Sequence, residues 1–205
     1  MKYSNSFYIT EISDELFNCI AGKSYKTDCK IPRTDLSYLH ILHMDFCKTV
    51  REGELICNSY IAKSLIDIFQ CLYEAEYQIE KVRLIDEYEA DDEMSMRDNN
   101  SSCFNYRTIS HTTCISKHGL GLAVDINPLY NPYVKPVGGR TVIEPANAVQ
   151  YADRTRHFLH KIDESDLCYQ LFTAHGFLWG GSFTHAKDYQ HFELPSEVTK
   201  RLYQT

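Results

Sequence analysis

The chain has 205 residues and lacks the features that mark two large classes of protein. No basic stripe appears in the sequence. The chain has 21 lysines and arginines and 28 aspartates and glutamates, for a formal charge of -7. Nucleic-acid binding depends on clustered cations, so no nucleic-acid partner is expected. No apolar run approaches the roughly 20 residues that a membrane-spanning helix needs. The sequence therefore predicts neither a nucleic-acid-binding protein nor a membrane span.

The start of the chain, MKYSNSFYITEISDELFNCI, also lacks the charged-then-apolar pattern of a signal peptide. Either the protein is not exported by that route, or the sequence is trimmed at its start. Hydrophobic residues make up 43% and charged residues 24% of the chain, which is typical of a globular protein. The length is sufficient to bury a core without disulfides or structural metals.

The eight cysteines contain no CxxC pair, so a closed thiolate zinc cluster is not predicted. Their even number is compatible with disulfides in an oxidising compartment. We favour the alternative that most are small buried hydrophobic residues, such as Cys71 in the apolar run LIDIFQCLYEAEY.

Hydrophobic periodicity predicts an α+β fold with a mainly antiparallel sheet flanked by helices. We expect an N-terminal arm or cap at residues 1–34 and one domain at 35–205. A helix is expected at 61–77, with Asn58 or Ser59 as its cap. Further helices are expected at 147–161 and 164–175, strands at 38–46, 81–88, 104–109, 121–128 and 189–194, and solvated loops at 89–102 and 127–140.

Three residues stand out in two segments rich in small and polar residues. His118 and Asp125 lie in SKHGLGLAVDIN, and His191 lies in KDYQHFEL. Two imidazoles and one carboxylate form a suitable ligand set for zinc, and three protein ligands leave the fourth position open, as in catalytic sites. The combination with a DxxH string makes this a stronger signal than either segment alone. His157 and His160 could share a helix face, but a solvated face is the simpler interpretation.

Two charged residues could complete a catalytic site. Asp188 precedes His191 by three residues, and its carboxylate could accept a proton from water beside the metal. The equally weighted alternative is that Asp188 caps the loop before the last strand. Arg107 could stabilise a carbonyl oxygen as charge develops. Its alternative is a surface ion pair with the acidic 86–93 stretch.

The residues from Ser116 to Asp125 fit the pattern SxHxxGxAxD, and Asp188 to His191 supply DxxH. Together they resemble the zinc D-alanyl-D-alanine carboxypeptidase family. That family includes the L-alanyl-D-glutamate peptidases of phage endolysins and shares its fold with Hedgehog domains. The Asp of DxxH and the segment GFLWGG at 176–181 are similar to the endolysin branch. The segments NYR at 105–107 and INPLYNPYV at 126–134 extend the resemblance, which covers most of residues 20–195.

The resemblance implies a Hedgehog/DD-peptidase-like fold with zinc held by His118, Asp125 and His191. It assigns Asp188 as the general base and Arg107 as the group that polarises the scissile carbonyl. It also makes two residues candidates for substrate contacts. Ser116 could contact substrate or serve loop geometry, and Trp179 could wall the cleft or belong to the core. Glu193 could orient His191 through its second ring nitrogen.

The implied function is that of a zinc metallopeptidase that hydrolyses an amide bond in the stem peptides of bacterial cell-wall peptidoglycan, as a D-alanyl-D-alanine carboxypeptidase does. An L-alanyl-D-glutamate endopeptidase is one alternative. A non-catalytic, zinc-stapled binding domain is another, although such a domain needs neither Asp188 nor Arg107. The substrate implies action outside the cytoplasm, in contrast to the missing signal pattern. Nothing in the sequence indicates an oligomeric state.

Overall fold

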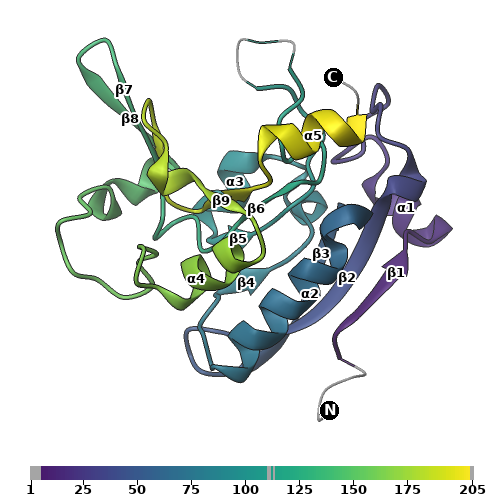
Figure 1. Cartoon of the computed structure of the whole chain (residues 1–205), viewed down its shortest axis with the longest axis horizontal. Coiled ribbons are helices and arrows are strands. Elements are labelled where there is room, and N and C mark those ends of the chain that lie inside the picture. Colours follow the sequence, from purple (N-terminus) through teal and green to yellow (C-terminus); the bar gives the residue numbers. More distant parts are fainter. Residues whose placement is uncertain (1–5, 110–111, 113, 204–205) are drawn as a thin grey trace.

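The computed structural model describes residues 6–109, 112 and 114–203 (Figure 1). Its α-helices are α1 (Asp14–Ile20), α2 (Ser59–Glu74), α3 (Asp92–Arg97), α4 (Leu167–Ala174) and α5 (Ser196–Tyr203). Short 3-10 helices are η1 (Arg33–Asp35), η2 (Ile85–Tyr88), η3 (Ala146–Tyr151) and η4 (Gly180–Ser182). The strands are β1 (Tyr8–Glu11), β2 (Leu36–Met44), β3 (Val50–Asn58), β4 (Lys81–Val82), β5 (Asn100–Ser101), β6 (Ala123–Asp125), β7 (Tyr133–Val137), β8 (Arg140–Glu144), β9 (Leu178–Trp179), β10 (Lys187–Asp188) and β11 (His191–Glu193).

The mixed composition of helices and mainly antiparallel sheets confirms the expected α+β class. Three sheets of three strands have the orders β1-β2-β3, β10-β7-β8 and β6-β11-β9. A fourth, two-stranded sheet pairs β4 with β5 in parallel. In the part of the chain that is described, no helix is both long and apolar enough to cross a membrane.

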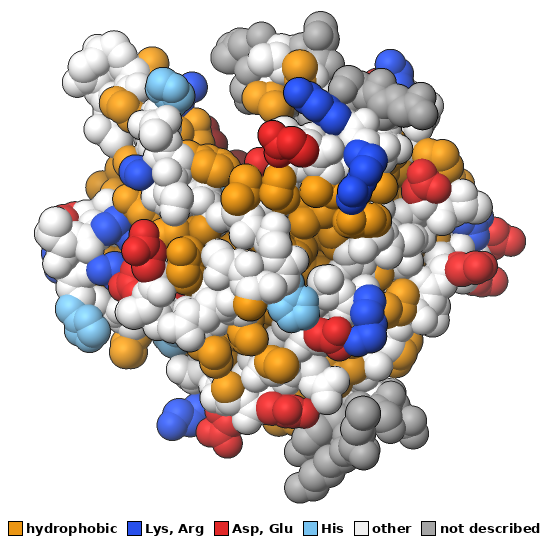
Figure 2. Space-filling model, viewed as in Figure 1, with side chains coloured by type: hydrophobic (Ala, Val, Ile, Leu, Met, Phe, Trp, Pro, Cys, Tyr) orange, Lys and Arg blue, Asp and Glu red, His pale blue; other side chains and the backbone are white. Residues whose placement is uncertain are grey.

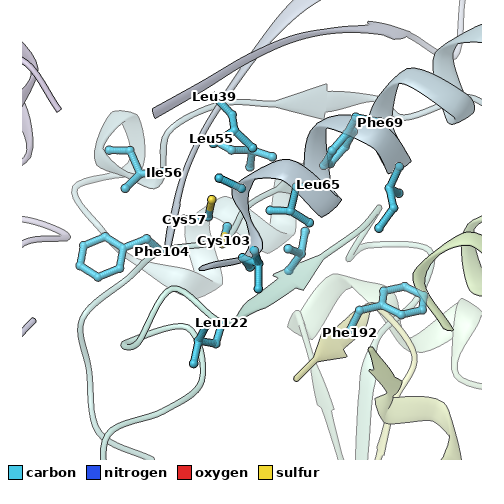
Figure 3. Close-up of a cluster of buried hydrophobic side chains, with 14 of the residues drawn as sticks. Leu39, Leu55, Ile56, Cys57, Leu65, Phe69, Cys103, Phe104, Leu122 and Phe192 are labelled. Atoms are coloured by element: carbon cyan, nitrogen blue, oxygen red, sulfur yellow. The ribbon is translucent and has the colours of Figure 1, made fainter. Parts of the chain in front are cut away.

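The core lies between the β1-β2-β3 sheet and α2. Buried and half-buried residues alternate along β2, which is the pattern of a strand with one covered face. Helix α2 begins where expected, because the Asn58 side chain accepts a hydrogen bond from the Tyr60 backbone N–H. Figure 3 shows Leu39 and Leu55 of the sheet clustered with Leu65 of α2. The apolar residues whose periodicity predicted the helix therefore form the face that α2 buries.

The segment before residue 35, predicted as an arm or cap, contributes both a strand and core residues. Strand β1 pairs with β2, with Tyr8 opposite His40. Ile20 and Ile31 are buried in the hydrophobic core.

The small β6-β11-β9 sheet connects this core to the residues singled out by the sequence. Val124 of β6 and Phe192 of β11 are fully buried and face each other in the strand register. This buried strand pair therefore fixes the backbone of the neighbouring residues Asp125 and His191. The β7–β8 hairpin projects from the same side of the molecule, at the upper left of Figure 1, and β10 pairs along it.

The run at 81–88, predicted as a strand, is a strand only over β4. The next residues turn into η2, where the buried carboxylate of Asp86 accepts hydrogen bonds from the backbone and hydroxyl of Ser24. This tertiary contact favours a turn over a strand. The run at 104–109, also predicted as a strand, forms no ladder, because Phe104 and Tyr106 donate their backbone N–H groups to separate segments, at Ile56 and Ser24.

The two predicted loops contain regular structure. Residues 89–102 include α3, which Asp91 caps by accepting from the Met94 N–H, and β5, whose Asn100 is buried. Residues 127–140 include most of the β7–β8 hairpin. Pro136 is tolerated in the middle strand of that sheet because β10 pairs with β7 only at 133 and 134.

The C-terminal half follows the predictions in part. The helix expected at 164–175 is α4, and its cap is Asp166. The prediction of a helix at 147–161 was wrong beyond the short helix η3. After η3 the chain turns, and His160 adopts a positive φ of 62°. Helix α5 follows the last strand and was not predicted.

The prediction that most cysteines are buried was wrong. Cys57, Cys103 and Cys168 are buried, whereas Cys71 and three others are exposed and Cys29 is half-buried. Cys71 lies on the solvent side of α2 because the apolar face of that helix is narrower than its apolar sequence run. All eight thiols are free.

We expect Gly121→Ala to destabilise the protein more than Gly138→Ala. Both glycines have positive φ, 67° and 55°, so each substitution costs about 1–2 kcal/mol of backbone strain. A Cβ at Gly121 would also lie 2.6 Å from the Asn58 nitrogen, whereas a Cβ at Gly138 meets nothing within 4 Å. Overpacking adds about 1–3 kcal/mol. Urea denaturation measures the difference, and equal losses in the two variants would contradict the close approach.

Candidate metal centre

His118 sits in a tight loop that fixes its ring. The Ser116 hydroxyl accepts a hydrogen bond from the Gly119 backbone N–H at 2.9 Å, and the Gly121 N–H donates to the His118 carbonyl at 2.9 Å. His118 Nδ1 lies 2.6 Å from the carbonyl oxygen of Cys103. A carbonyl can only accept, so Nδ1 carries the ring proton and Nε2 is bare in the neutral ring.

His191 and Asp125 are brought together by strand pairing. They are directly opposed in the antiparallel register of β11 and β6, so their side chains leave the sheet on one face. His191 Nε2 lies 3.1 Å from Glu193 Oε2, two residues along the same strand. Since a carboxylate accepts, Nε2 donates its proton and Nδ1 is bare in the neutral ring. The contact expected of Glu193 is present.

The three residues form a compact ligand triangle, in which Asp125 faces each ring with a different carboxylate oxygen. His118 Nε2 is 3.1 Å from His191 Nδ1 and 3.1 Å from Asp125 Oδ2, and His191 Nδ1 is 3.0 Å from Asp125 Oδ1. Zinc–ligand bonds of about 2.0–2.1 Å place the donors of a tetrahedral site about 3.3 Å apart. One ligand atom from each residue can be chosen so that all three lie within 4.8 Å of one another, so His118, Asp125 and His191 fit a zinc ion.

The electrostatics of the cluster require a positive charge among these atoms. Burial opposes ionisation of both Asp125 and His191. The charge and hydrogen bonds of His118 and His191 nevertheless lower the pKa of Asp125 well below its usual range. Hydrogen bonds to Asp125 and Glu193 raise the pKa of His191 to about 10. In the metal-free protein a proton on His191 supplies the positive charge, and a metal ion would displace it.

Asp188 lies beside this cluster on β10. Glycine is required at position 180, because a Cβ there would lie 2.5 Å from the Asp188 carbonyl oxygen and 3.2 Å from the His191 Cβ. Among the described residues, the buried Asp188 Oδ1 has no hydrogen-bond partner. Burial, reinforced by the charge of Asp125, raises the pKa of Asp188 to about 6. A carboxyl group with this pKa can accept and return a proton near neutral pH.

Asp188 and His191 open onto a cleft of about 600 Å³. It is also lined by Tyr133 of β7 and by the segment 182–186. Figure 2 shows the surface hollowed beside the protruding β7–β8 hairpin. Tyr133 and Phe183 were not singled out from the sequence, because an isolated aromatic residue in a predicted loop carries no spacing signal.

The remaining candidates, Arg107, Ser116 and Trp179, are not among the described residues that line the cleft. Arg107 Nε lies 2.5 Å from Asp92 Oδ2, so the ion pair with the acidic 86–93 stretch is formed. The Arg107 backbone is joined to the His118 loop, since its carbonyl accepts from the Ser116 N–H. Ser116 is buried, and its hydroxyl shapes the loop. Trp179 is also buried and donates to the Tyr189 carbonyl, as part of the core.

The other histidine pair does not form a second site. Residues 157 and 160 share no helix, and the His160 ring stacks on Phe46 with centroids 3.6 Å apart.

We expect zinc to stabilise the folded protein by binding to His118, Asp125 and His191. At a zinc concentration 100-fold above Kd, the free energy of unfolding should rise by about 2.7 kcal/mol. The affinity should increase about tenfold per pH unit between pH 6 and 8, because binding releases the proton that His191 holds up to a pKa of about 10. Thermal unfolding and calorimetry with and without zinc measure both effects.

His118→Ala should abolish this stabilisation, and His157→Ala, at an exposed position, is the matched control that should retain it. Equal zinc stabilisation of the two variants would contradict the ligand assignment.

The comparisons with known proteins agree with this geometry. A family model described as D-alanyl-D-alanine carboxypeptidase matches residues 110–194, which is less than half of the chain. No curated protein and no solved structure matches. The matched segment contains His118, Asp125 and His191. The match therefore supports the D-alanyl-D-alanine carboxypeptidase family, and with it a peptidase function, for the part of the chain that carries the candidate metal centre.

Proposed function

We propose that the protein is a zinc metallopeptidase that hydrolyses an amide bond in peptidoglycan stem peptides, in the manner of a D-alanyl-D-alanine carboxypeptidase. One observation carries the proposal. A ligand triangle of His118, Asp125 and His191 borders an open cleft, and the buried carboxylate of Asp188 lies in the same cleft with an unpartnered oxygen. The family match supports the substrate class.

His118, Asp125 and His191 would hold the zinc ion, and Cys103 and Glu193 would keep the two rings in the ligating tautomer. When bound, zinc supplies Lewis acidity and lowers the pKa of water at the site to about 7. Three protein ligands are typical of a catalytic zinc site, whereas structural sites use four.

Asp188 is the general base and later the general acid. Its carboxylate takes a proton from the attacking water and returns the proton to the leaving amine. The raised pKa of about 6 suits both steps, because the group is ionised at neutral pH and readily protonated during the reaction. Its position is held by the close packing of Gly180 against its backbone.

Arg107 stabilises the negative charge that develops on the scissile carbonyl oxygen. One backbone contact supports this role, because the Arg107 carbonyl accepts from the Ser116 N–H and so joins Arg107 to the His118 loop. The ion pair with Asp92 is the alternative role of Arg107, and the guanidinium would have to exchange that partner for the substrate. The side chain is about one-third exposed, although Arg107 is not among the described residues that line the cleft.

We expect Asp188→Ala to retain zinc and to lose peptidase activity by a factor of roughly 10²–10⁴, because the variant lacks the proton acceptor. The measurement is the release of products from purified muropeptides, followed by mass spectrometry. Asp67→Ala, at the surface of α2, is the matched control and should keep full activity. Full activity of the Asp188 variant would contradict the mechanism. A wild-type protein that binds zinc and muropeptides without cleaving them would instead be a zinc-stapled binding domain.

An L-alanyl-D-glutamate endopeptidase is the second candidate, and the similarity of DxxH and of GFLWGG at 176–181 to the endolysin branch favours it. A carboxypeptidase needs a cation or a group of N–H donors for the terminal carboxylate of its substrate. None of the described residues that line the cleft is a lysine or arginine, although His185 lies among them. An L-alanyl-D-glutamate endopeptidase binds no terminal carboxylate, but the glutamate beside its scissile bond keeps one free carboxyl group, so the lining alone does not separate the two candidates.

Stem peptides with a free or an amidated C-terminus separate the two candidates. An endopeptidase should cleave both forms at similar rates, and the product masses identify the bond. A carboxypeptidase should lose at least tenfold in kcat/KM on the amidated peptide, because removal of the charge removes a charge-assisted contact of about 1.5–3 kcal/mol. That loss, with D-alanine as the released product, would contradict the second candidate.

A further inference from the structure

The cleft beside the metal centre is lined, apart from the catalytic groups, by aromatic and small uncharged residues and by His185. Two aromatic residues from separate segments line it, Tyr133 of β7 and Phe183 after η4. Ser182, Thr184 and Ala186 add small side chains. Beside Phe183 and Tyr133, such a surface favours a small, uncharged part of a substrate, because a charged group there would lose hydration without gaining a partner.

Phe183 is the lining residue that stands next to the metal ligands. Its ring lies edge-on to the His191 ring, with centroids 6.3 Å apart and an interplanar angle of 60°. The side chain is half-buried, so one part packs against the protein and the rest faces the cleft. A substrate whose scissile bond lies at the metal must therefore place a neighbouring side chain close to Phe183.

The segment that carries Phe183 is fixed at both ends. At one end, the Phe183 N–H donates to the Gly180 carbonyl at 3.1 Å, and Gly180 packs directly on the backbone of Asp188. At the other end, Lys187 Nζ donates to the Gly181 carbonyl at 3.0 Å, and Asp188 pairs with Tyr133 across β10 and β7. A wall anchored in this way can discriminate by size, since it does not yield to a larger side chain.

Trp179, the aromatic residue that the sequence suggested as a cleft wall, cannot take this role in the observed fold. It is only 7% exposed, its indole donates to a backbone carbonyl, and Gly181 covers its ring.

We propose that Phe183 is the specificity-determining residue of the site and limits the size of the side chain that flanks the scissile bond. The inference rests on the proposed peptidase function. In this arrangement Phe183 admits an alanine methyl group and excludes longer aliphatic side chains at one flank. Tyr133 lines the same cleft, but the ring contact with His191 is made by Phe183.

The test is the substrate preference of Phe183→Ala in the zinc-loaded protein. Once the wild-type cleavage site is known, the residue on each side of that bond is varied separately among alanine, norvaline and leucine. The ratio of kcat/KM for leucine to that for alanine should rise at least tenfold at one flank, because one extra methylene in such a pocket changes selectivity by about 10–200-fold. Phe46→Ala, outside this cleft, is the matched control and should keep the wild-type ratio.

Melting temperature and zinc content establish that the variant is folded, and Phe183→Leu provides a milder change if the alanine variant is unstable. An unchanged ratio at both flanks in a folded, active variant would overturn the proposal. Failure of the wild-type protein to cleave any stem peptide would instead refute the proposed peptidase function, so the two failures are distinguishable.

Discussion

The site depends on the antiparallel pairing of β6 with β11. This register puts His191 opposite Asp125, and the loop that begins at Ser116 adds His118 from the side. In the neutral state of both rings, the two bare ring nitrogens lie about 3 Å from each other, and each lies about 3 Å from one oxygen of Asp125. Such an arrangement is unfavourable without a cation or a proton between the atoms, because three electron-rich groups are held together in a buried place. The backbone therefore builds a site that requires positive charge.

The same backbone links the site to the hydrophobic core. Val124 and Phe192, next to the ligands in β6 and β11, are fully buried. Gly121 approaches the Asn58 nitrogen so closely that the His118 loop rests on the start of α2. Gly180 makes a comparable approach to Asp188. Through these contacts the rigid core fixes the positions of the ligands. Catalysis depends on such precise positioning of the reacting groups.

The local sequence predicted the candidate centre better than it predicted the surrounding chain. His118, Asp125 and His191 come together as their motifs indicated, because each motif is short and its residues belong to one turn or strand. The error at 81–88 arose because Asp86 is held by Ser24, more than 60 residues earlier, and no local pattern reports such a contact. Trp179 and Phe183 show the same limit, since which of two aromatic residues faces a cleft depends on packing. The catalytic roles of Asp188 and Arg107 remain predictions.

The central claim is that two histidines and one aspartate bind zinc and leave part of its coordination to solvent or substrate. X-ray absorption at the zinc edge of the loaded protein tests it most directly. The account predicts a four-coordinate ion with two imidazole nitrogens and two oxygens at about 2.0–2.2 Å, and no sulfur. It also predicts that the imidazole signal weakens in a His191→Ala variant. Sulfur at about 2.3 Å, or a spectrum unchanged by the loss of His191, would place zinc elsewhere and contradict the account.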